Sequence, residues 1–191
     1  WDPNYAQAYV GLAGCYGQLM GWTAITTSQA LPLVNQALDR AEAIDPTTPG
    51  LQVLRAAMLS AVERKLAIAD QKFKAALSEE TADVESLLYY GRHLLVSGQS
   101  EAALEVFQTV LELDPLSPLS YGIYSYGLHC ARRTDEALQM IDRGLTLEPE
   151  AVILLFFKCL IKAHSGFYSE ALNAGQTILS LSPTLPGIIS T

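Results

Sequence analysis

Small residues recur at a fixed interval of 34 positions along much of this 191-residue chain. One series consists of Ala57, Gly91, Ser125 and Cys159, and a second consists of Ala69, Ala103, Ala137 and Ala171. Three periods close on a dipeptide that ends in proline: Asp114-Pro115, Glu148-Pro149 and Ser182-Pro183. A constant period of this length indicates stacked supersecondary units, each in contact with its neighbours, and it argues against one globular core.

Each period has the pattern of two helices joined by a short turn. Between residues 84 and 97, apolar residues follow helical spacing at Leu87, Tyr90 and Leu94. We expect Gly98 to end this first helix, because glycine accepts the left-handed conformation found after a helix. Asp114-Pro115 should end the second helix, because proline cannot continue one. Gly91 and Ala103 would let the two helices approach closely, so the sequence predicts an antiparallel hairpin.

The period divides the chain into five repeats, predicted at residues 4–48, 49–83, 84–117, 118–151 and 152–185, with a sixth beginning at 186–191. Repeat 1 is longer, because its closing Asp45-Pro46 follows Pro3 by 43 residues. This extra length falls around Gly21–Ser28, where we predict an extended loop, with Ser28 or Thr27 capping the next helix. Trp1-Asp2-Pro3 matches the close of a preceding repeat, and the last residues match the opening of a sixth, so we expect a single array that is a fragment of a longer one.

The repeats resemble the tetratricopeptide repeat (TPR) over residues 2–183. The resemblance lies in the spacing of aromatic, Leu, small residue and Tyr in the first helix, and of Ala, aromatic, Ala and Pro in the second. It implies an all-α fold, a right-handed α-solenoid of antiparallel hairpins, and a non-enzymatic scaffold for protein–protein interaction. Residues 4–22 and 29–46 also resemble repeat regions of bacterial signalling proteins such as adenylate cyclases, Ser/Thr kinases and winged-helix regulators. This second resemblance implies a larger bacterial signalling or regulatory protein.

In the TPR family the first helix of each hairpin lines the concave face. The groove residues carried over to this chain are Leu88, Tyr89, Arg92, Ile123, Tyr126, His129, Phe156, Phe157 and Leu160. Some family members hold a carboxylate with Lys at position 5 of the repeat, where this chain has Val10, Leu54, Leu88, Gly122 and Phe156. The face therefore suits an apolar peptide or an amphipathic helix, with Tyr89, Tyr126 and Phe157 as anchors. The alternative is that these apolar faces pack internally or pair in a homo-oligomer.

Other classes of function receive little support from the sequence. The 20 acidic and 12 basic residues leave a net charge of −8 and no basic stripe for nucleic acid. The most apolar run, at Val152–Ile161, is about half as long as a membrane span. Neither Cys15, Cys130 and Cys159 nor the three histidines have the spacing of a metal site or a nucleophile.

We therefore expect no enzyme activity, metal or cofactor, and no membrane insertion in this segment. The cysteine usage favours the cytoplasm, with the periplasm as the alternative. The sequence leaves Lys158 and Lys162 open, because both occupy positions that hold apolar residues in other repeats. Either their stems extend out of a terminal interface, or the helix is rotated.

Overall fold

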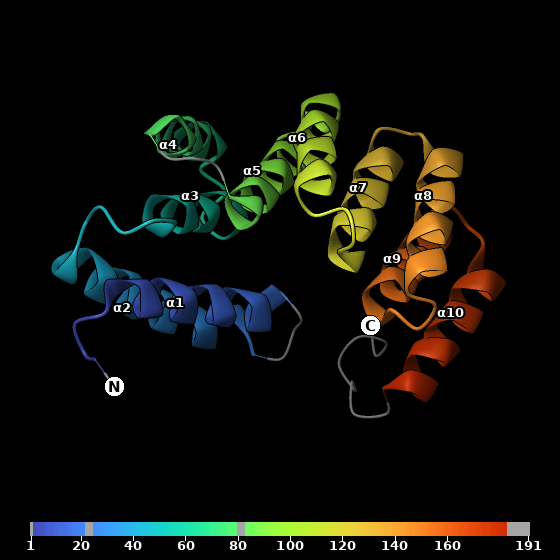
Figure 1. Cartoon of the computed structure of the whole chain (residues 1–191), viewed down its shortest axis with the longest axis horizontal. Coiled ribbons are helices and arrows are strands. Elements are labelled where there is room, and N and C mark those ends of the chain that lie inside the picture. The colour runs from blue at the N-terminus through green and yellow to red at the C-terminus, as the bar shows by residue number, and fades with distance from the viewer. Residues whose placement is uncertain (1, 22–24, 80–82, 183–191) are drawn as a thin grey trace. The chain divides into compact units, whose positions relative to one another are not determined.

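The computed structural model describes residues 2–21, 25–79 and 83–182, and all of its regular structure in these ranges is helical (Figure 1). The helices in the described ranges are α1 (Ala6–Gly21), α2 (Thr27–Ile44), α3 (Leu51–Ala61), α4 (Leu66–Glu79), α5 (Val84–Val96), α6 (Ser100–Leu113), α7 (Pro118–Cys130), α8 (Thr134–Leu147), α9 (Val152–His164) and α10 (Tyr168–Leu181). Each predicted repeat contains one successive pair of them. The predicted all-α fold of antiparallel helix hairpins is confirmed.

The helices form two compact bodies, one of residues 2–93 and one of residues 94–182. In the N-terminal body α1 packs against α2, and α3 packs against α4. In the C-terminal body α7 packs against α8 and α9 against α10, while α7 also contacts α6 and α9. Contacts within each body therefore join helices of the same or adjacent repeats, as expected for stacked units.

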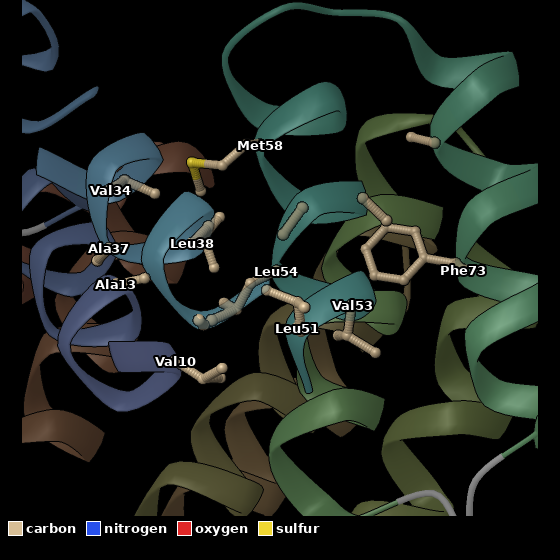
Figure 2. Packing of buried hydrophobic residues seen from close by; sticks show 14 residues of the cluster. Val10, Ala13, Val34, Ala37, Leu38, Leu51, Val53, Leu54, Met58 and Phe73 are labelled. Carbon is tan, nitrogen blue, oxygen red and sulfur yellow. The ribbon is translucent and has the colours of Figure 1, made fainter. Parts of the chain in front are cut away.

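The core of the N-terminal body is a cluster of aliphatic residues with one large aromatic ring, Phe73 (Figure 2). Phe73 of α4, Leu38 of α2 and Leu51 of α3 are fully buried. Ala57 and Ala69, one from each small-residue series, belong to the same cluster. Small side chains at these positions let the helices of a hairpin come close together.

The core of the C-terminal body combines buried residues of the four helices α6 to α9 and the N-cap of α9: Leu104, Leu128, Ala137, Ile141, Ala151, Leu154 and Ile161. Ser125 is fully buried and donates its hydroxyl hydrogen to the carbonyl oxygen of Tyr121, at 2.6 Å, so the polar group has a partner within its own helix. Cys159 is half-buried, and burial raises the pKa of its thiol. Gly127 leaves room for Phe107, because a Cβ at Gly127 would lie 3.0 Å from the ring.

The turns inside the hairpins reveal a further series with the same 34-residue spacing. Arg64, Gly98, Arg132 and Gly166 have positive φ angles of 58°, 76°, 65° and 82°. The predicted left-handed conformation at Gly98 is confirmed, and the adjacent Gln99 N–H donates to the Leu94 carbonyl, as in a Schellman motif. Repeats 2 and 4 place arginine in the same conformation, which costs roughly 1–2 kcal/mol for a residue with a Cβ.

The predicted extended loop of repeat 1 is largely wrong. Helices α1 and α2 have 16 and 18 residues, whereas α5 and α6 of repeat 3 have 13 and 14. Seven of the nine extra residues therefore lengthen the helices. The expected loop is reduced to the connection between Gly21 and Thr27, of which residues 22–24 lie outside the described residues.

The predicted N-cap of α2 is also wrong by one or two residues. Thr26 is the N-cap: its hydroxyl accepts from the Gln29 N–H at 3.3 Å, and the Gln29 side chain accepts from the Thr26 N–H at 3.0 Å. This reciprocal capping box needs a Gln or Glu three residues after the cap, and Gln29 meets that requirement only for Thr26. The predicted sixth repeat at 186–191 lies outside the described residues. Among the described helices, none is long and apolar enough to cross a membrane.

Candidate binding surface

Helices α7 and α9 lie against each other in the C-terminal body and carry six of the nine predicted groove residues. These residues are Ile123, Tyr126, His129, Phe156, Phe157 and Leu160, and each is half-buried. We call this set the α7–α9 surface. Their side chains are partly accessible to solvent, in contrast to core residues such as Leu128 and Leu154 on the same helices.

Aromatic rings of the α7–α9 surface contact one another. The ring centroids of Tyr126 and Phe157 are 6.1 Å apart, and those of Phe156 and Phe157 are 5.6 Å apart in an edge-to-face arrangement. These separations lie within the favourable range for aromatic pairs. Gly122 allows the approach, because a Cβ at this position would overlap the Phe157 ring. Gly122 stands at position 5 of its repeat, where some family members have a carboxylate-binding lysine. The absence of a side chain at Gly122 thus lets Phe157 pack against α7.

A cavity of about 590 Å³ lies at the end of this surface. Its lining residues come from the ends of α7 and α9, from the turns that follow them and from the first turn of α8: Tyr126, His129, Cys130, Arg132, Thr134, Asp135, His164, Ser165 and Phe167. The imidazole rings of His129 and His164 stack with centroids 5.8 Å apart. His129 Nδ1 also pairs with the Thr134 hydroxyl at 3.0 Å.

The surroundings of the cavity shift the pKa values of three lining residues, His129, Tyr126 and Cys130. The pKa of His129 is lowered, first by burial and then by the nearby His164 and Arg132. The pKa of Tyr126 is raised, mainly by burial and also by the neighbouring Cys130. Neutral imidazole and neutral phenol are therefore the favoured forms of these two groups at neutral pH.

The other three predicted groove residues, Leu88, Tyr89 and Arg92, belong to α5 in the N-terminal body. Tyr89 is half-buried and packs against that body's core, and burial raises the pKa of its hydroxyl to about 12. Its hydroxyl approaches α1, where a Cβ at Gly14 would lie 3.9 Å away. Leu88 is half-buried and Arg92 is exposed. The nine predicted residues thus fall into two groups, one in each body.

Lys158 and Lys162 form ion pairs with the neighbouring helices. Lys158 Nζ lies 2.8 Å from an Asp142 carboxylate oxygen on α8, and Lys162 Nζ lies 2.7 Å from a Glu170 carboxylate oxygen on α10. The Lys162 ammonium also lies 4.7 Å from the ring centroid of Phe167. Each ammonium thus binds a carboxylate of an adjacent helix. The sequence did not indicate these partners because they depend on how the helices pack.

The sequence also missed the contribution of the turns to the cavity. Arg132, Thr134 and Phe167 precede or begin second helices, which the carried-over family pattern does not assign to the groove. The one available signal was that His129 and His164 both map to the concave side, one repeat apart. Within the described ranges, no group of three or more His, Cys, Asp or Glu side chains is placed to hold a metal ion.

No protein-family model matches the chain, and no curated protein matches it. Solved structures do share its arrangement of helices. YrrB, described as a TPR protein with an unusual peptide-binding site, is 17% identical, with a TM-score of 0.53 over 95% of this chain and 88% of its own. This chain has the TPR fold.

Two further structures support the TPR fold. The crystal structure of MamA is 14% identical, with a TM-score of 0.57 over 82% of this chain and 91% of its own. IFIT1 in complex with Gppp-AAAA is 18% identical, with a TM-score of 0.74 over 96% of this chain and 44% of its own. At these identities the likeness concerns the TPR fold alone, a fold that serves generally as a scaffold for protein–protein interaction.

Proposed function

We propose that the chain is a non-enzymatic interaction module that binds an apolar peptide or amphipathic helix of a partner protein on the α7–α9 surface. The observation that carries this proposal is the set of half-buried aromatic side chains, Tyr126, Phe156 and Phe157, grouped on two adjacent first helices. Rigid aromatic side chains lose little conformational entropy on binding and are enriched among residues that dominate binding energy. The group on α5, Leu88, Tyr89 and Arg92, would extend the same role to the N-terminal body.

The charge of the chain and of the α7–α9 surface favours a peptide ligand over a nucleic-acid ligand. The chain carries a net charge of −8, and the α7–α9 surface holds no lysine or arginine. Affinity for nucleic acid depends on phosphate neutralisation by such residues. Binding of the Gppp-AAAA ligand seen with IFIT1 is therefore not proposed for this chain.

We also propose a wider context, a larger bacterial signalling or regulatory protein in the cytoplasm. Its support is the resemblance of repeat 1 to repeat regions of bacterial signalling proteins. A module that only binds needs an attached domain to act on the signal, and TPR arrays supply binding surfaces of this kind. Sequencing of the full gene would test this context, since a natural start at Trp1 or a flanking domain unrelated to signalling would contradict it.

The binding proposal is tested with peptides selected from a displayed library of amphipathic helices. We expect the double variant Tyr126→Ala, Phe157→Ala to bind the selected peptide less tightly. The loss of binding free energy should be about 2 kcal/mol or more, the range typical of buried aromatic anchors. Tyr168→Ala is the matched control, because Tyr168 is an aromatic residue 68% exposed on α10, outside the surface. Circular dichroism must show unchanged helicity in both variants. Equal affinity of the double variant and the control would contradict the proposal.

The alternative function is self-association, and the exposed face of α10 favours it. Leu172 is 65% exposed, whereas Leu104, its equivalent two repeats earlier, is 6% exposed and lies beside Gly127 of the following helix α7. A second copy that offers a similar helix would cover Leu172 in the same way. We expect Leu172→Glu to abolish any association seen by light scattering across protein concentration. A wild-type chain that stays monomeric at every concentration would rule this function out.

A further inference from the structure

We propose that the cavity beside His129 and His164 binds the carboxylate of an apolar peptide, and that it binds this group more tightly when the imidazoles are protonated. The inference rests on the proposed function, because the adjoining α7–α9 surface would hold the rest of the peptide. It adds a chemical requirement, a carboxylate, that the aromatic residues alone do not impose. It also adds a dependence on pH.

The turn between α7 and α8 supplies the cation that would hold the carboxylate. Arg132 lines the cavity and is exposed, and it has no ion pair among the described residues. Its guanidinium can donate two parallel hydrogen bonds to a carboxylate. The neighbouring charges are already matched, because Arg133 pairs with Glu136 at 2.7 Å and Lys162 pairs with Glu170 at 2.7 Å. Arg132 is therefore the cation available to a ligand.

The two imidazoles supply the dependence on pH. His129 Nδ1 is engaged by the Thr134 hydroxyl, which leaves Nε2 as its second polar atom. Its ring stacks with that of His164, so positive charges on both rings would repel each other without an anion between or beside them. A bound carboxylate offsets that repulsion and favours protonation. Binding should therefore take up protons, and by linkage the affinity should rise as the pH falls.

The other titratable groups of the lining are consistent with an ionised carboxylate as ligand. Asp135 is the one carboxylate among the lining residues, and Arg132 is the one permanent cation, so these two charges cancel at neutral pH. Tyr126 and Cys130 are neutral there, since burial raises the pKa of both. Imidazole protonation thus makes the cavity cationic. A singly charged carboxylate matches this modest charge better than a doubly charged phosphate.

Apolar walls adjoin the polar end of the cavity. Phe167 is 48% exposed at the rim, and Tyr126 links the cavity to Phe157, whose ring centroid lies 6.1 Å from that of Tyr126. A peptide with an apolar side chain next to its carboxylate could place that side chain on these rings. The C-terminal residue of such a peptide can be represented by N-acetylphenylalanine, which carries an ionised carboxylate above about pH 4.

The inference is tested by NMR titration of the intact chain with N-acetylphenylalanine and with its uncharged amide at pH 8 and pH 6. We expect the acid to bind about tenfold more tightly at pH 6 than at pH 8, because binding is linked to imidazole protonation. The amide should bind weakly and equally at both values. The imidazole signals of His129 should titrate at higher pH with the acid bound. His93, buried in the N-terminal body, is the internal reference and should not respond.

The role of Arg132 is separated from its structural effect by a pair of glycine variants. Arg132→Gly should raise stability, because residue 132 has a positive φ of 65°. It should also lower the affinity for N-acetylphenylalanine about tenfold, because a charged hydrogen bond is lost. Arg64→Gly is the matched control, with a φ of 58° at the equivalent turn in the other body. It should raise stability in the same way and leave binding unchanged.

Three results would overturn the inference. The first is equal binding of acid and amide, the second is equal binding by the two glycine variants, and the third is inorganic phosphate binding more tightly than the acid. Each of these leaves the proposed function intact if the library-selected peptide still requires Tyr126 and Phe157. Loss of that requirement with retained acid binding would instead contradict the proposed function alone.

Discussion

His93 shows how burial changes the chemistry of a single residue. Its side chain is buried in the N-terminal body, 2% exposed, and its ring packs against Phe73 with centroids 5.1 Å apart. His93 Nδ1 pairs with the Ser60 hydroxyl at 2.9 Å, while Nε2 lies 3.8 Å from an Asp70 carboxylate oxygen without a hydrogen bond. Burial lowers the pKa of His93 although the Asp70 carboxylate acts in the opposite direction. The neutral ring is therefore part of the folded core.

This lowered pKa predicts loss of stability in acid. An unfolded histidine protonates near pH 6.5, and the folded chain holds His93 neutral to lower pH. The unfolded state then binds more protons, so the free energy of unfolding should fall as the pH drops below about 6.5. Urea unfolding between pH 8 and pH 5 measures this.

Substitution of His93 tests whether this residue causes the loss of stability at low pH. We expect His93→Gln to make the stability of the N-terminal body less dependent on pH, even if the variant is less stable at pH 8. Hydrogen exchange of the amides in that body measures its stability. His129→Gln is the control, because His129 belongs to the C-terminal body. An equal flattening in both variants, or in neither, would argue against His93 as the source.

Glycines inside the helices act at the scale of the element. Gly122 and Gly11 both occupy helix interiors, in α7 and α1, where alanine is favoured intrinsically by up to about 1 kcal/mol. They differ in what a side chain would meet. A Cβ at Gly122 would overlap the Phe157 ring, whereas a Cβ at Gly11 would have nothing within 4 Å. The same substitution should therefore have opposite effects in the two helices.

We expect Gly122→Ala to reduce the free energy of unfolding by about 1–3 kcal/mol, because overpacking displaces the Phe157 ring. Gly11→Ala should increase it by up to about 1 kcal/mol. Urea unfolding of both variants measures the difference. Combining Gly122→Ala with Phe157→Ala should recover part of the loss, since neighbouring residues are energetically coupled. Strict additivity of the two substitutions would show that the ring does not cause the effect.

At the scale of the whole molecule, each body has its own buried cluster. The cluster around Phe73 draws on α1 to α4, and the cluster around Ile141 draws on α6 to α9. Repeat proteins are stabilised by contacts within repeats and between nearest neighbours, so damage can stay local. The two clusters therefore allow the bodies to open separately.

We expect Phe73→Ala to cost about 3–5 kcal/mol, because it empties a fully buried aromatic site. Hydrogen exchange should show loss of protection in α1 to α4, with α7 to α10 little changed. Ile141→Ala is the matched variant in the other body and should show the reverse distribution. Equal loss of protection in both bodies after either substitution would mean that the chain unfolds as one cooperative unit.

The sequence by itself determined the repeating part of the fold, because the signals involved are local. Helical spacing of apolar residues, glycine or proline at helix ends and small residues at contact positions all act within a few turns of the chain. They predicted the antiparallel helix hairpins and the left-handed Gly98. Local signals led to a wrong prediction in repeat 1, where both an extended loop and longer helices were compatible with them. The extra residues kept a helical pattern and lengthened α1 and α2.

Only the tertiary structure decided how side chains from different repeats meet. His129 and His164 are 35 residues apart in the chain, yet their rings stack, and the turn at Arg132 adds a cation beside them. Likewise, Lys158 and Lys162 acquire acidic partners from α8 and α10. Such contacts depend on the distances between packed helices and on side-chain rotamers, which no local spacing rule specifies. The 34-residue period determined the hairpins, and their packing decided that α7 and α9 together form an aromatic surface that ends in a polar cavity.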